Sequence, residues 1–185
     1  MGRIDAAMTR DCETDIDFAL IDELIGALAH QATFEPENED SSLPRRIDVH
    51  ELARSRGYEV QRGGMDSDLP SSSSAGIRIP EFYSRREERL AIARGLARYE
   101  LRNLSQLCDA EGHDKCPSEE ACELARNPDK KAIEELAAAL LIPMAELEAW
   151  DGKLGDDMLA TLFGVPVATL KMRSKTIREH RELAN

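Results

Sequence analysis

Aromatic residues are scarce in this chain, which has one Trp, three Tyr and four Phe among 185 residues. Proteins that bind single-stranded nucleic acids stack the bases on aromatic side chains, so such a platform is not expected here. A long apolar run is also missing. The longest, Leu136–Ala145, is interrupted by Pro143, so no membrane-spanning helix is expected.

Positive charge is in deficit. Lys and Arg number 24 against 36 Asp and Glu, which gives a formal net charge of −12. A chain of this charge repels the phosphate backbone, which argues against broad nonspecific nucleic-acid binding but leaves room for a local basic patch. The stretch Met1–Asp15 is polar and lacks the apolar core of a secretory signal, so we expect a cytoplasmic location. The cysteines should then be reduced thiols; they are Cys12, Cys108, Cys116 and Cys122.

The spacing of apolar residues predicts a mainly helical α+β fold with a small sheet. Ser84 and Glu87 form a capping-box pattern, and Gly57 is placed to end a helix. We expect a flexible leader over 1–14, a core over 15–150 and a C-terminal helical element over 151–185. The expected helices are 15–32, 48–56, 84–102, 118–125, 128–141, 145–150 and 156–183, the last broken near Pro166. Short strands are expected at 58–61 and 77–80, and polar loops at 35–43, 63–74 and 109–118.

Five segments occur in an order that resembles a known family. They are DVHELARSRGYEV (48–60), GIRIP (76–80), RREERLAIARGLARYEL (85–101), ELAAALLIP (135–143) and LFGVPVATLKMR (162–173). Together they resemble the ImmA/IrrE family of zinc peptidases over roughly residues 45–175. The resemblance implies a zincin-like core followed by a hairpin similar to a helix-turn-helix. It also implies a repressor-like protein partner, in a mobile-element, phage or stress-response circuit.

The zinc site of that family depends on an H-E-x-x-H helix, in which two histidines one turn apart hold the metal. Aligned on this helix, the chain has Arg94, Gly95 and Arg98 at the His, Glu and His positions. A guanidinium group keeps its proton and offers no lone pair, so it cannot be a zinc ligand. Gly95 removes the general base and costs about 1 kcal/mol relative to Ala in mid-helix, although it would permit close backbone approach.

The family's third ligand is a glutamate before the LLxP stretch. The alignment puts Glu134 and Glu135 one or two residues away from that position, which turns a side chain by about 100–200° around a helix. The two arginines have two interpretations. They hold a carboxylate or phosphate ligand, or they form a solvated face paired with Glu87, Glu88 or Glu134. We favour the second.

Two other groups of residues have alternative functional interpretations. His50 and Glu51 begin like H-E-x-x-H, but the motif ends in Arg54 and lies in the wrong helix for the family. Cys108, His113, Cys116 and Cys122 lie within fifteen residues, so they form a candidate structural zinc site. Their spacing lacks a C-x2-C knuckle, and reduced thiols around a helix connection are the simpler interpretation.

The segment Asp156–Lys175 is similar to a helix-turn-helix, with Gly164 at the turn. In such a motif the second helix enters the major groove. The candidate DNA contacts are Lys171, Arg173, Lys175 and Arg178. The alternative, which we favour, is a small helical hairpin that packs on the core.

The sequence therefore predicts a non-catalytic, regulatory or protein-binding relative of the zinc peptidases, with no cofactor expected beyond a possible structural zinc. One alternative is an active hydrolase with a relocated site that uses His50, Glu51, Glu134 or His113. Another is a DNA-binding regulator that uses the C-terminal helices. An accessory protein without chemistry of its own is a further alternative.

Overall fold

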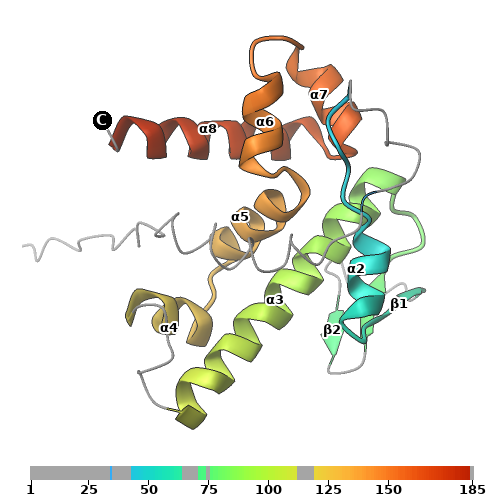
Figure 1. The fold of residues 1–185 in the computed structure, drawn as a ribbon. Coiled ribbons are helices and arrows are strands. Elements are labelled where there is room, and N and C mark those ends of the chain that lie inside the picture. The colour runs from blue at the N-terminus through green and yellow to red at the C-terminus, as the bar shows by residue number, and fades with distance from the viewer. Residues whose placement is uncertain (1–33, 35–42, 64–70, 74–75, 112–118, 184–185) are drawn as a thin grey trace, which may run out of the picture.

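The protein is described from a computed structural model, which places residues 34, 43–63, 71–73, 76–111 and 119–183. At 71–73, 107–111, 119–122 and 183 it describes the backbone only. This part of the chain is mainly helical with one small sheet, which confirms the predicted α+β class (Figure 1). The helices are α2 (Val49–Ser55), α3 (Arg85–Glu111), α4 (Glu119–Arg126), α5 (Lys130–Leu141), α6 (Met144–Trp150), α7 (Asp156–Phe163) and α8 (Val167–Leu183). The strands are β1 (Glu59–Arg62), β2 (Ser71–Ser73) and β3 (Gly76–Ile79).

Two of these elements differ from the sequence expectation. The serine-rich stretch expected to be a loop contributes β2, which pairs antiparallel with β3. Backbone pairing needs no particular side chain, so a run of serines gives little signal for a strand. The helix that begins at Arg85 runs to Glu111 rather than to about Arg102. The expected helix over 15–32 lies outside the described residues.

The sheet has the strand order β1-β3-β2, with β1 parallel to β3. Its central strand, β3, places Ile77 and Ile79 in the interior and Arg78 in solvent, which is the alternation expected of a half-buried strand. The helix α3 packs against β2 and β3 on one side and against α4 and α5 on another. Figure 1 shows α3 between the sheet with α2 and the pair α4 and α5.

The first half of α3 is buried around most of its circumference, since Leu90, Ala91, Ile92 and Ala93 are all less than a tenth exposed. Its start matches the expected capping box. The backbone N–H of Ser84 donates to Glu87 at 2.8 Å, and the N–H of Glu87 is 3.4 Å from the Ser84 hydroxyl. Both groups would otherwise lack intrahelical partners.

Glycine ends two of the helices in the same way. Gly57 follows α2 with φ of 77°, and Gly164 follows α7 with φ of 67°. After α7 the N–H of Val165 donates to Ala160 O at 2.9 Å, and the N–H of Gly164 donates to Thr161 O at 3.1 Å. This pair of bonds is a Schellman motif, which requires a left-handed residue at its centre.

The two-helix element α7–α8 is part of the same hydrophobic core as the rest of the chain. Its side chains Leu159, Phe163, Val165 and Leu170 are at most 3% exposed and belong to the cluster that includes Ile77 on β3. The expectation of a helical hairpin packed on the core is therefore confirmed. The boundary expected at residue 150 lies between helices that share one hydrophobic core.

Candidate functional site

The α3 positions that the family resemblance aligns with a metal site contain an ion pair. Arg94 donates to Glu134 Oε2 from Nε at 2.9 Å and from Nη2 at 2.8 Å. The two side chains are 22% and 21% exposed, so the pair is largely covered by protein. Of the acidic partners that the sequence left open for Arg94, the structure selects Glu134.

Glu134 is one of the partners offered by the interpretation that we favoured for the arginines, and the structure confirms this pairing for Arg94. The Glu134 carboxylate on α5 faces α3 and contacts Arg94 directly. Glu135, one residue further along α5, does not contact Arg94 in this way. Its side chain is buried against α8, where both carboxylate oxygens accept from Thr176 Oγ1. A register count along an unaligned helix carries an error of one or two residues, and one residue changes the direction of a side chain by about 100°.

Gly95 is fixed by packing against the sheet. A Cβ built at this position would lie 2.8 Å from Ile77 Cδ1, 2.9 Å from Cγ1 and 3.0 Å from Cγ2. Ile77 is fully buried, so it has little space into which to move. The glycine therefore lets α3 approach β3 closely, and no larger residue fits without displacement of Ile77.

Arg98, one turn after Arg94, is half-buried, and two causes lower its pKa. Burial is the larger, and the positive charge of Arg94 adds to it, whereas Glu134 raises the pKa. A guanidinium group stays protonated even so, since its ordinary pKa is above 12. The residues at this site do not fit a zinc ion. Both family histidine positions hold cations, and the nearby carboxylate is already bound by one of them.

The other proposed metal group lies mostly outside the described residues. His113 and Cys116 are not placed, and only the backbone is described at Cys108, near the end of α3, and at Cys122 in α4. Among the described side chains, no group of three or more His, Cys, Asp and Glu could hold a metal. The zinc prediction for the cysteines is therefore untested.

Of the residues named for a relocated hydrolase site, His113 lies outside the described residues, and the other three are not brought together. On α2, Glu51 forms an ion pair with Arg54, and His50 Nε2 lies 3.7 Å from Glu88 Oε1. Glu134 is on α5 and is bound by Arg94. In the described part of the chain, these acids have arginine partners in place of a nucleophile or a metal.

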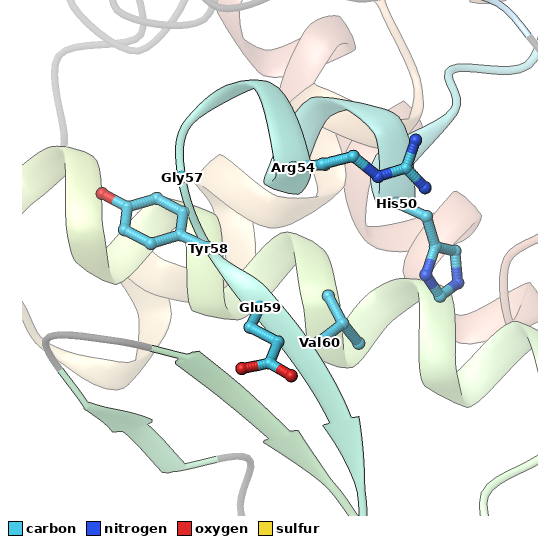
Figure 2. A pocket seen from close by; sticks show the side chains of 6 residues that line it. All are labelled: His50, Arg54, Gly57, Tyr58, Glu59 and Val60. Carbon is cyan, nitrogen blue, oxygen red and sulfur yellow. The ribbon is translucent and has the colours of Figure 1, made fainter.

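A pocket of about 460 Å³ opens between α2 and β1. Figure 2 shows its lining: His50, Arg54, Gly57, Tyr58, Glu59 and Val60. The buried carboxylate of Glu88 lies next to it, where it accepts hydrogen bonds from Arg62 and has His50 Nε2 at 3.7 Å from its Oε1. Glu88 is 7% exposed and contacts His50, which lines the pocket.

One of the four candidate DNA contacts was wrong. Arg173 is 2% exposed, and its Nε donates to Ile142 O at 3.4 Å, so it packs α8 onto the core and faces no ligand. Its position was assigned from charge alone, and a buried arginine has the same letter as an exposed one. Lys171, Lys175 and Arg178 are exposed.

The exposed basic residues of α8 are mixed with acidic ones. They line a surface hollow of about 460 Å³ together with Asp156, Ser174, Glu179 and Glu182. Lys175 lies 3.4 Å from the Glu179 carboxylate in an i,i+4 ion pair. The face therefore carries charges of both signs, in contrast to the basic stripe typical of DNA-binding surfaces.

Arginines that sequence analysis did not single out attach α7 to the core. Arg46 donates from Nε to Leu162 O and from Nη2 to Thr161 O, both at 3.0 Å. Arg86 donates to Thr161 Oγ1 at 3.1 Å, whereas Arg89, which lies beside Gly164 at the end of α7, donates to Ile47 O at 2.9 Å. The cations lie at the C-terminal end of α7, where free carbonyl groups and the helix dipole favour positive charge.

No helix in the described residues is long and apolar enough to cross a membrane. No family model matches this chain, and no curated protein matches it either. A solved structure described as a Mycobacterium tuberculosis transcriptional regulator is similar in fold, with a TM-score of 0.56 and 21% sequence identity. The match covers 82% of this chain and 55% of the other, so this chain spans about half the length of that regulator. At this identity the likeness supports a shared fold.

Proposed function

We propose that the chain is a non-catalytic, regulatory or protein-binding protein on an ImmA/IrrE-like, zincin-like scaffold. The observation that carries the proposal is the ion pair between Arg94 and Glu134. In the aligned site the permanently charged guanidinium group of Arg94 takes the place of the family's zinc ion, and its two hydrogen bonds occupy the Glu134 carboxylate. The close contact of Gly95 with Ile77 supports it, because the general base of the family would not fit there.

The partner we propose is a repressor-like protein, as the family resemblance implies. The name of the similar solved structure, a transcriptional regulator, favours the same process. On this scaffold the chain binds its partner without cleaving it. The circuit would be a phage, mobile-element or stress-response circuit.

Metal analysis of the purified full chain tests the proposal. We expect no zinc at the α3 site, so the metal content should not change in a Glu134→Gln variant. Zinc bound at the cysteine group would be measured as well, so a Cys116→Ser variant serves as the control for that group. Zinc that persists in Cys116→Ser and is lost in Glu134→Gln would overturn the proposal.

A second candidate is a DNA-binding regulator. It is supported by the described two-helix turn, in which Gly164 has the left-handed conformation, and by the name of the similar structure. A mobility shift at about 150 mM salt tests it, because phosphate-dominated binding weakens steeply with salt. Binding that survives and is lost in Lys171→Ala or Arg178→Ala would support DNA contact. The Arg173→Ala variant is unsuitable here, since that residue packs the core.

A further inference from the structure

The strand β1 has one hydrogen-bonding edge that faces away from the sheet. The N–H of Gly63 donates to Ile79 O on the β3 side at 3.1 Å, and the N–H of Tyr58 donates to Ala53 O on the α2 side at 2.9 Å. Backbone groups of successive residues in a parallel strand point to alternate sides. Val60 and Arg62 therefore direct their N–H and C=O groups away from β3.

Among the residues that the structure describes, this edge of β1 is unpaired and lies next to the pocket. In the described part of the chain, no strand pairs with β1 on that side, and no backbone hydrogen bond is made by the N–H of Val60 or Arg62 outside the sheet. The pocket of about 460 Å³ lies alongside, and Val60 lines it. An edge with unpaired peptide groups is a template for another extended chain.

The charged side chains around the edge of β1 indicate which kind of peptide segment would bind there. Figure 2 shows Arg54 extending from α2 toward His50 on the same side of the pocket, while Glu59 points away from them. The side chains of His50 and Arg54 are 47% and 75% exposed. The partner of Arg54 is Glu51 in an exposed i,i+3 pair, which contributes little and is readily exchanged.

We propose that the free edge of β1 binds an extended segment of a protein partner by strand addition. One side chain of that segment is Asp or Glu and faces His50 and Arg54. The backbone groups of Val60 and Arg62 provide the hydrogen bonds, and the two basic side chains provide the preference for an acidic residue. The inference rests on the proposed protein-binding function and assigns the surface that performs it.

Two synthetic peptides test the inference with the full chain. Both have six residues of alternating threonine and valine, and one central residue is glutamate in the first and lysine in the second. Backbone amide NMR is recorded during titration. We expect the Val60 and Arg62 amides to shift and to gain protection from hydrogen exchange with the glutamate peptide, and the lysine peptide to bind roughly threefold more weakly.

Two variants at one position provide the matched control. Val60→Pro removes the outward N–H without removing a bond to β3, whereas Val60→Ala shortens the same side chain and keeps the N–H. We expect loss of peptide binding in the first and retention in the second. An Arg54→Glu variant should reverse the preference between the two peptides.

Three results would overturn the inference. The first is slow exchange of the Val60 and Arg62 amides in the free chain, which would show that the edge is already covered. The second is amide shifts that follow protein concentration alone, which would show that a second copy occupies the edge. The third is that Val60→Pro binds each peptide as tightly as Val60→Ala does. None of these results depends on metal content, so they are separable from failure of the zinc experiment.

Discussion

Arg94 on α3 donates two hydrogen bonds to a single carboxylate oxygen of Glu134 on α5. The pair therefore links the two helices that pack most extensively against one another in the described part of the chain. Removal of either partner leaves the other charge partly buried and without its main counter-ion, and Arg98 adds a second cation nearby. The pair thus contributes to the structure at the position where the family resemblance would place chemistry.

A double-mutant cycle with Arg94→Gln and Glu134→Gln measures this contribution. We expect a coupling free energy of about 1 kcal/mol, because the pair is mostly covered but retains access to solvent. The exposed pair Lys175 and Glu179 provides the comparison, with an expected coupling of about 0.3–0.5 kcal/mol. Urea denaturation of the variants gives both values. A coupling at Arg94 no larger than that at Lys175 would contradict the structural role.

Substitution of Gly95 tests the close contact between α3 and β3. Alanine favours the helix by about 1 kcal/mol, but overpacking a core costs typically 1–3 kcal/mol. Ile77 is fully buried, so we expect Gly95→Ala to lower the free energy of unfolding by about 1 kcal/mol. In the background Ile77→Ala, which removes all three contacting atoms, the same substitution should be neutral or stabilising. An equal loss in both backgrounds would show that contact with Ile77 is not the cause.

Arg173 should affect stability, whereas its neighbour Lys171 should not. Arg173 is 2% exposed and bonds to the carbonyl of Ile142, so Arg173→Ala leaves a cavity and an unpaired acceptor. We expect a loss of about 2–4 kcal/mol in the free energy of unfolding. Lys171→Ala, at an exposed position of the same helix, should stay within about 0.5 kcal/mol. Similar losses in both variants would refute the assignment of Arg173 to the core.

Local sequence signals predicted much of this fold. The capping box of Ser84 and Glu87 begins α3, and Gly57 and Gly164 end helices in the left-handed region. These signals act within one turn, so the spacing of residues along the chain is enough to read them. Helix boundaries near such caps agree closely with the structure, for example at α2, which was expected over 48–56 and spans Val49–Ser55.

The parts that sequence analysis missed depend on contacts between distant segments. Arg46 reaches Leu162, and Glu135 reaches Thr176, across separations of 116 and 41 residues. No local pattern distinguishes an arginine that caps a distant helix from one in solvent, which is why Arg173 was assigned to DNA contact. The choice among Glu87, Glu88 and Glu134 as the partner of the arginines stayed open for the same reason, since the sequence alone does not fix the rotation of α5 against α3.

Glu135 makes stability depend on pH in a direction opposite to that of most carboxyl groups. Burial, the largest cause, raises its pKa above the ordinary value, and the hydrogen bond from Thr176 and the charge of Arg173 lower it by less. The folded state then binds more protons than the unfolded state between the two pKa values. The contribution of this group to stability is therefore present below a pH of about 4.5 and is lost as the pH rises through the raised pKa.

A Glu135→Gln variant cannot titrate at this position and can still accept the hydrogen bond from Thr176. We expect the free energy of unfolding of the wild type, minus that of the variant, to fall as the pH rises from about 4 to 7. Urea denaturation at several pH values measures this difference. Glu87→Gln is the control of opposite sign, because hydrogen bonds from the Ser84 hydroxyl and backbone lower the pKa of Glu87. Its wild-type contribution is present above the ordinary pKa and lost as the pH falls. A difference for Glu135 that rises with pH, as for Glu87, would show that Arg173 and Thr176 outweigh burial.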